Sequence, residues 1–167
     1  GDITPANERG RIAFNVNAEL DQWAFRDTHQ FQVDVDASQL NVGDLKNLAG
    51  VEAPVTGTLS ANVSLHGSQL NPIGKGTVSL TQATVADEPV QSATVDLEGT
   101  GDELRVRLGL RMPAGNPQGN FTYFPKRKAY DGQLQANGIR LDQFRTLRTR
   151  NLDLAGTLNL NAATAAV

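Results

Sequence analysis

The fold class of this 167-residue chain is decided by the stretch Gly57-Thr58-Leu59-Ser60-Ala61-Asn62-Val63-Ser64-Leu65. Aliphatic side chains occupy every second position from Leu59 to Leu65, and small polar side chains fill the positions between them. Because a strand turns successive side chains to opposite faces, this pattern is typical of a strand with one apolar and one polar face.

The same alternation recurs along most of the chain. The other alternating runs are 12–20, 32–37, 76–80, 93–97, 104–110, 119–124, 132–136 and 152–160. Turn-forming residues, mainly Gly, Pro, Asn and Asp, separate these runs at 71–72, 88–89, 99–102, 113–117 and 131–132. We therefore predict an all-β fold with at least eight short strands that form antiparallel meanders.

Two segments break the alternation with apolar residues at helical spacing. The first has apolar residues at positions 40, 42, 45 and 48, and the second has them at 139, 141, 144 and 147. Each segment predicts a strand end that continues into one or two helical turns. Asp44 and Asp142 fall near the expected helix starts, where a carboxylate suits the unpaired N–H groups of the first turn.

The two interrupted segments belong to an internal repeat at an offset of 99 residues. Residues 33–62 align with residues 132–161 without a gap, and six of the thirty positions are identical. The apolar pattern, the helical interruption and a following Gly-Thr-Leu all keep register, as in arrays whose units stack along one axis. We predict one unit at 33–131 and the start of the next at 132–167, so that residues 1–167 are a single β-rich excerpt of a longer repeat protein.

Composition excludes several kinds of site. The chain contains no cysteine, which excludes disulfides, Cys-ligated zinc and thiol chemistry. No window approaches the roughly 18 apolar residues of a membrane-spanning helix, and the N-terminus lacks the pattern of a signal peptide. Because the chain begins with Gly1 rather than methionine, we expect any membrane anchor of the full-length protein to lie outside these residues.

The net charge of −3 conceals two regions of opposite sign. Residues 1–104 carry five basic and fifteen acidic residues, whereas residues 105–150 carry ten basic and two acidic ones. The asymmetry fits neighbouring repeats that complement each other or a solvated edge, and it also fits contact with anionic headgroups. Nucleic acid is disfavoured as a partner because the basic residues lack the interleaved aromatic residues that stack on single-stranded bases.

Neither of the two histidines predicts a catalytic centre. His29 and His66 both lack an acid and a nucleophile at motif spacing, so we predict no catalytic residue and no enzyme activity. Two acidic pairs, at positions 34 and 36 and at 102 and 103, lack the ligand spacing of a calcium loop. We predict solvated carboxylates there, with no metal site and no cofactor.

The order of the parts within one unit carries a family resemblance. A unit reads Gly-x-Leu-x-Ala with Ile-x-Leu, then Gly-Thr-Leu with Val-x-Leu-x-Gly, a linker with proline, Gly-x-Val-x-Leu, and lastly Gly-x-x-Leu-x-Val-x-Leu. In this chain the parts are residues 132–144 (with 33–45 as their other copy), 57–67, Pro72, 76–83 and 101–108. This order resembles the repeats of the AsmA-like superfamily, especially the TamB type. Val33, which stands where the second copy has Gly132, and the basic run at 125–128 depart from the family pattern.

The resemblance implies an elongated, twisted antiparallel sheet folded into a trough or groove, a taco- or solenoid-like form with an apolar inner face. Members of this superfamily are thought to bridge the inner and outer membranes of diderm bacteria and to pass phospholipid along the trough. For this chain it implies a periplasmic segment of a protein anchored in the inner membrane. The implied partners are phospholipid or another acyl lipid, an outer-membrane barrel protein and neighbouring repeats of the same chain.

Because side chains alternate between the two faces of a strand, the sequence predicts which of them would line such a lipid groove. The predicted lining consists of Leu59, Ala61, Val63, Leu65, Val78, Leu80, Val95, Leu97, Leu104, Val106, Leu108, Leu110, Leu158 and Leu160. The same face would also form if it packed against a second sheet in a dry sandwich core. The sequence therefore leaves open a structural β-solenoid or adhesin-like scaffold as the alternative.

Overall fold

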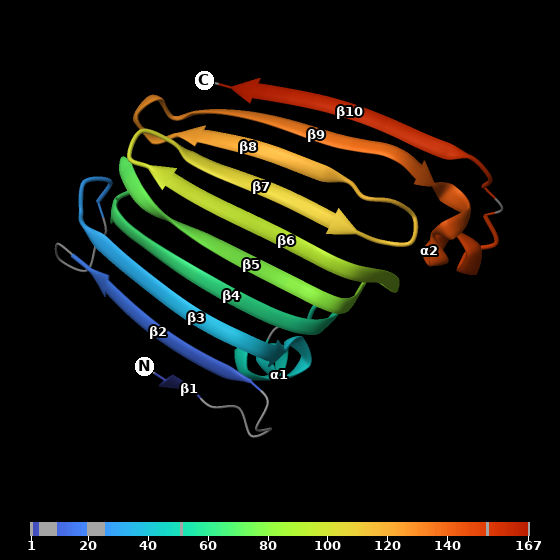
Figure 1. Ribbon diagram of the computed structural model, residues 1–167, viewed down its shortest axis with the longest axis horizontal. Coiled ribbons are helices and arrows are strands. Elements are labelled where there is room, and N and C mark those ends of the chain that lie inside the picture. The colour runs from blue at the N-terminus through green and yellow to red at the C-terminus, as the bar shows by residue number, and fades with distance from the viewer. Residues whose placement is uncertain (1, 4–9, 20–25, 51, 153, 167) are drawn as a thin grey trace.

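The computed structural model describes residues 2–3, 10–19, 26–50, 52–152 and 154–166. Its strands form one sheet in which each strand pairs antiparallel with the next one along the chain (Figure 1). The strands are β1 (Asp2–Ile3), β2 (Arg11–Ala18), β3 (Phe31–Asn41), β4 (Val55–Ser68), β5 (Asn71–Val85), β6 (Glu88–Thr100), β7 (Leu104–Arg111), β8 (Gln118–Phe124), β9 (Ala129–Arg140) and β10 (Thr157–Ala166). The sheet is open, and the predicted all-β antiparallel meander is confirmed.

The strands are longer than predicted, and several predicted turns lie inside them. β4, β5 and β6 contain 14, 15 and 13 residues. Asn71-Pro72 begins β5, Glu88-Pro89 begins β6, and Asp131-Gly132 lies within β9. Turn-forming residues occupy these strand positions because tertiary pairing overrides their local preference.

The basic run that departs from the family pattern makes the turn between β8 and β9. Pro125–Arg127 form a single 3₁₀ turn, η1, and Lys128 follows it in the left-handed conformation (φ 51°). The last predicted strand is also displaced, because β10 begins at Thr157 rather than near Leu152.

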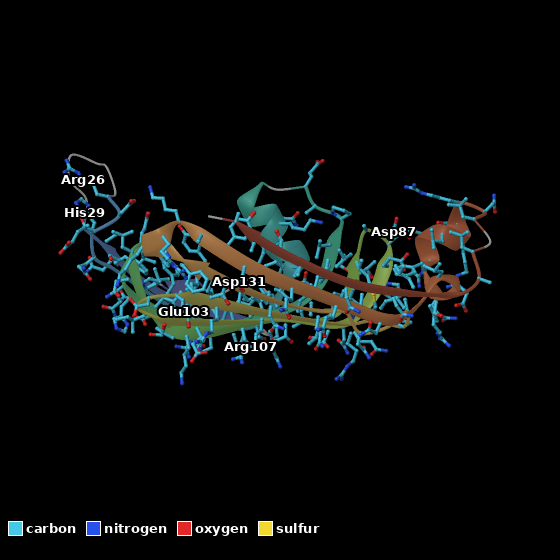
Figure 2. All side chains as sticks on the ribbon, turned by 90° about the horizontal axis from the view of Figure 1, so that it is seen from above. Arg26, His29, Asp87, Glu103, Arg107 and Asp131 are labelled. Carbon is cyan, nitrogen blue, oxygen red and sulfur yellow. The ribbon has the colours of Figure 1, made fainter. Side chains whose placement is uncertain are left out.

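Both predicted helical interruptions are confirmed as short helices. α1 (Val42–Ala49) follows β3, while η2 (Leu141–Gln143) and α2 (Arg145–Thr149) follow β9. The cap of α1 is Asn41, whose side-chain oxygen accepts from the Gly43 amide at 2.8 Å and the Asp44 amide at 3.4 Å. Asp44 therefore lies in the first turn instead of capping it. α1 and α2 lie on the same side of the sheet in Figure 2.

The buried core of the described residues is small and lies mainly beside the helices. Leu40 (2% exposed) lies near the end of β3, two residues before α1, which packs on β3 and β4. Ile139 and Ala136 pack with Ala114 and with the partly buried Phe144, which lies between η2 and α2. The helices therefore cover the face that carries Leu40 and Ile139, and they cover only part of it.

Residues 33–62 and 132–161, which align in sequence, also share an irregular backbone feature. The β3–β4 register shifts between Ala37 and Leu40, and the β9–β10 register shifts between Leu158 and Leu160. Gln39 (φ 50°) and Gly138 (φ 66°), 99 positions apart, are left-handed at these bulges. The division of the chain into units at 33–131 and 132–167 stays a prediction.

Candidate functional site

The strand register joins most of the predicted lining residues into rows across the sheet. Residues that pair directly in an antiparallel sheet point to the same face and lie close together. The rows across β4, β5, β6 and β7 are Leu59–Leu80–Ala93–Leu110, Ala61–Val78–Val95–Leu108, Val63–Gly76–Leu97–Val106 and Leu65–Gly74–Gly99–Leu104. The predicted residues of these four strands therefore form one continuous patch, called here the apolar face.

The remaining two predicted residues lie apart from this patch, on the edge strand. Leu158 pairs with Ile139 and Leu160 pairs with Ala136, so β8 and β9 separate them from β7. The sequence prediction omitted the side chains that bridge this gap. They are Phe121 and Tyr123 on β8 and Tyr130 and Leu134 on β9, all placed on the apolar face by their pairing. The alternation within 119–124 and 132–136 was the signal for Phe121 and Leu134.

The apolar face also extends to the other edge of the sheet. Phe31, Val33, Val35 and Ala37 of β3 pair with Gly67, Leu65, Val63 and Ala61 of β4. On β2, the residues Ile12, Phe14, Val16 and Ala18 pair in turn with β3. The face therefore runs without interruption from β2 to β10.

Much of the apolar face is open to solvent. Val16 is 61% exposed, Leu108 37%, Tyr130 45% and Leu160 41%. All described strands belong to one sheet, so no second described sheet covers this face. An apolar surface of this extent is unusual for an isolated soluble domain and is typical of a surface that contacts another apolar group.

Glycines let large side chains lie flat on the apolar face. A Cβ at Gly132 would come within 2.5 Å of the Phe121 ring, and a Cβ at Gly76 within 2.8 Å of Val63. Phe121 therefore covers the Gly132 backbone of its neighbouring strand, as aromatic residues do over strand glycines. The result is a smoother surface than alternating large residues would give.

The opposite face of the sheet is mainly polar, and hydrogen bonds between neighbouring strands join several of its side chains. The Ser64 hydroxyl donates to Asp34 at 2.7 Å, and the Thr77 hydroxyl donates to Asp96 at 2.8 Å. Hydrogen bonds from Ser64 and Gln32 lower the pKa of Asp34. In Figure 2, Arg107 lies on the side of the sheet away from the helices. The two faces are thus chemically distinct over most of the sheet.

The acidic and basic regions of the sequence meet where β6 pairs with β7. Arg105 lies opposite Glu98 and Arg107 lies opposite Asp96, and the Arg105 Nη1 atom is 3.8 Å from Glu98 Oε2. At the neighbouring turns, Lys126 donates to Asp102 at 2.6 Å, and this hydrogen bond and the lysine charge lower the pKa of Asp102. Cross-strand complementation therefore accounts for part of the charge asymmetry.

The histidines lie away from the apolar face. His66 pairs with Gln32 and Ile73 on the polar face. The ring Nδ1 of His29 lies 3.1 Å from the Glu19 carbonyl oxygen and 3.3 Å from the Arg26 amide nitrogen. Among the described residues, no group of three or more His, Cys, Asp or Glu side chains could hold a metal ion.

Sequence reasoning also missed Glu88, which positions α2 from a distant part of the chain. Its carboxylate accepts from the Arg145 amide at 3.0 Å, from the Thr146 amide at 2.7 Å and from the Thr146 hydroxyl. Burial raises the pKa of Glu88, but the hydrogen bonds from Thr146 and Arg145 outweigh burial and lower it overall. No local signal links residues 57 positions apart.

Comparison with known proteins gives no information on function, so the apolar face is the main evidence for it. The sequence matches no family model, and neither a curated protein nor a solved structure is significantly similar to the chain. None of the helices in the described ranges is long and apolar enough to cross a membrane.

Proposed function

We propose that this chain is a segment of a periplasmic, envelope-spanning protein whose apolar face binds or conducts the acyl chains of phospholipids between the inner and outer membranes. The observation that carries the proposal is the single-layered apolar face, which runs from β2 to β10 with side chains such as Leu108 and Leu160 more than a third exposed. The sequence resemblance to TamB-type repeats supports the same function.

The chemistry of an acyl chain fits such a surface. Each methylene group taken out of water contributes about 0.8 kcal/mol, so an uninterrupted aliphatic lane can hold a chain without specific contacts. The rows from Leu59 to Leu110 and from Leu65 to Leu104 run across four strands without a charged residue. Affinity is then spread over many similar contacts, which allows a lipid to slide.

The rest of the proposal rests on the resemblance. It includes a trough-like shape for the sheet, an inner-membrane anchor in the full-length protein and an outer-membrane barrel protein as a partner. A structural scaffold with a dry sandwich core is the second candidate. It would require a second layer over residues such as Leu134 and Tyr130, supplied from outside the described part of this chain.

Native mass spectrometry with organic extraction, on the protein purified from bacteria, tests the proposal. We expect co-purified phospholipid that is lost at least tenfold in Leu134→Glu and Leu160→Glu, because each places a charge on the apolar face at a site already 38% or 41% exposed. Val63→Glu and Val106→Glu extend the test to the centre of the face.

Neighbouring polar-face variants are the matched controls. Gln133→Glu and Asn161→Glu add the same charge on the same strands but on the opposite face. We expect both to retain lipid. A folded, monomeric, lipid-free protein would contradict the proposal and favour the closed scaffold.

A further inference from the structure

Several residues of the basic region already have partners in the sheet and its turns. Arg105 and Lys126 make ion pairs, Arg107 lies opposite Asp96, and Arg127 lies 4.2 Å from the centre of an aromatic ring. Among the described residues, no ion pair is formed by Lys128 at the β8–β9 turn or by four arginines at the opposite end of the sheet, namely Arg111, Arg140, Arg148 and Arg150. The unpaired positive charge therefore lies mainly where β7 and β9 end, beside α2 (Figure 1).

Arg148 and Arg150 are the two of these arginines that lie on the side of the apolar face. Both are exposed, and α2 lies on the side of the sheet that carries Ile139 (Figure 2). Arg111 and Arg140 belong to the polar face by their pairing with β6 and β10. The carboxylate of Glu88 already occupies the first turn of α2, so a further anion beside this helix would meet arginine side chains and not its amides.

Exposed leucines lie next to these two arginines. Leu152 and Leu154, which follow α2, are each 48% exposed. The Leu152 amide donates to the Leu147 carbonyl at 3.0 Å, which holds this segment against α2. Basic groups beside exposed aliphatic ones suit the interfacial part of a phospholipid, where an anionic headgroup meets the acyl chains.

The other helix at this end of the sheet lacks the combination. α1 carries Asp44 in its first turn, and the exposed Glu52 follows the helix. The ammonium group of Lys46 donates to the Val55 carbonyl at 3.3 Å. An anionic group is therefore favoured beside α2 and disfavoured beside α1.

The length of the apolar lane beside α2 suits one layer of acyl chains. From Leu158, near the helices, to Thr164, β10 spans about 20 Å at about 3.3 Å per residue. One leaflet of a bilayer holds acyl chains about 15 Å long, half of its roughly 30 Å hydrocarbon core. A phospholipid with its headgroup at α2 can therefore keep its chains on the apolar face of β9 and β10.

We propose that the side chains of Arg148 and Arg150 hold the phosphate of an anionic phospholipid whose acyl chains lie along β9 and β10 on the apolar face. The inference rests on the proposed function, and it adds a lipid class, a headgroup site and an orientation. Each basic side chain near an anionic lipid strengthens binding about fivefold, so the pair should favour an anionic over a zwitterionic headgroup by about 30-fold at low salt.

Competition between two phospholipids with identical acyl chains tests the headgroup site. The intact, delipidated chain is incubated with vesicles of equal parts phosphatidylglycerol and phosphatidylcholine and then separated from them, and the bound lipids are quantified by mass spectrometry. We expect bound phosphatidylglycerol to exceed phosphatidylcholine by about tenfold or more, and the ratio to fall as salt is added. Arg148→Gln with Arg150→Gln should bring the ratio close to one and leave the amount of bound phosphatidylcholine unchanged.

A polar-face variant is the matched control. Arg107→Gln with Arg111→Gln removes the same charge from the opposite face, and it should keep the preference. A preference that persists in the α2 variant, or that falls equally in the polar-face variant, overturns the headgroup site. Equal binding of both lipids by the unaltered chain also overturns it and leaves the proposed function standing. Failure to retain either lipid after separation from the vesicles overturns both proposals.

Paramagnetic quenching tests the orientation. Because the chain has no cysteine, a fluorophore can be attached at Thr149→Cys on α2 or at Thr164→Cys. Both threonines are exposed, and Thr164 pairs with Gly132 on the apolar face at the far end of β10. A nitroxide on the phosphatidylglycerol headgroup should quench the probe at position 149 more strongly, and a nitroxide at the end of an acyl chain the probe at position 164. The reverse pattern, or equal quenching at the two positions, overturns the orientation.

Discussion

Two short helices, α1 and α2, lie at the same end of the sheet (Figure 1). Their N-termini are capped by different kinds of contact. α1 is capped locally by Asn41, the residue directly before it. α2 has no local side-chain cap, and the carboxylate of Glu88, on the β5–β6 hairpin, binds its first two amides instead. The strands before the two helices share the same bulge. The same strand geometry can therefore precede either a helix that is capped by its own neighbour or a helix whose cap depends on tertiary contact and on charge.

The largest effect is expected when the distant cap is removed. Glu88→Ala deletes the acceptor of the Arg145 and Thr146 amides and of the Thr146 hydroxyl. Loss of a helix cap costs about 1–2 kcal/mol, so hydrogen exchange at residues 145–149 should accelerate about 5- to 30-fold. Exchange at residues 42–49 should stay unchanged.

Two control variants distinguish loss of the Glu88 cap from a general destabilisation of the chain. Asp87→Ala removes a neighbouring exposed carboxylate that takes no part in the hydrogen bonds from Arg145 and Thr146, and it should leave α2 protected. Asn41→Ala should loosen α1 alone. Equal loosening of both helices by Glu88→Ala would mean that the two helices are coupled, and would contradict their independent capping by Asn41 and Glu88.

Lowering the pH should destabilise α2 but not α1. The pKa of Glu88 is lowered in the folded chain, so its ionised form stabilises α2 above the ordinary glutamate pKa, about 4.3. That stabilisation is lost as the pH falls through the lowered pKa of Glu88. Asn41 carries no charge, so the cap of α1 should persist. Backbone chemical shifts of residues 42–49 and 145–149, followed downward from about pH 6, where carboxylates are ionised, check the difference.

Glu88→Gln is the control for the titration. The amide keeps an acceptor oxygen but cannot be protonated in this range, so the acid transition of α2 should disappear. A transition that persists at the same pH in Glu88→Gln would assign it to another titratable group.

The outcome of sequence reasoning differs between local and distant features. Alternation with a period of two is local, and it correctly placed Leu59, Val63 and Leu108 on one face. It could not locate the turn after β8, because Asp131-Gly132 favours a turn locally while the sheet uses both residues in pairs with Thr122 and Phe121. Alternation also did not assign Tyr123 and Tyr130 to the apolar face, because they join it through their pairing with Leu104 and with each other.

Glu88 marks the limit of prediction for the helices. The apolar spacing at 139–147 predicted a helical turn, and α2 is found there. The carboxylate that caps its first turn belongs to Glu88, on the β5–β6 hairpin. Neither the spacing of apolar residues nor local helix propensity could reveal this contact. Bulges are equally hidden, since Gln39 adopts a left-handed conformation that its residue type does not favour.

The smallest effect on stability is expected from substitutions at the bulge that β3 and β9 share. Gly138 (φ 66°) and Gln39 (φ 50°) hold equivalent bulge positions with different residue types. A Cβ at Gly138 would meet nothing within 4 Å, so Gly138→Ala should destabilise the chain only through its backbone conformation, by about 1 kcal/mol. Gln39→Gly should act in the opposite direction, by a few tenths to about 1 kcal/mol, because it relieves the same backbone cost.

Urea unfolding measures both variants, and Gly109→Ala is the matched control. A Cβ at Gly109 would also meet nothing within 4 Å, but Gly109 lies in β7 without a positive φ. Alanine there should be neutral or stabilising, since glycine weakens a strand interior by about 0.5–1 kcal/mol. Equal responses at positions 138 and 109 would show that the left-handed conformation at the bulge imposes no cost. The two bulges would then resemble each other in their register shift and in the hydrogen bonds of the Gln39 and Gly138 amides, but not in backbone cost.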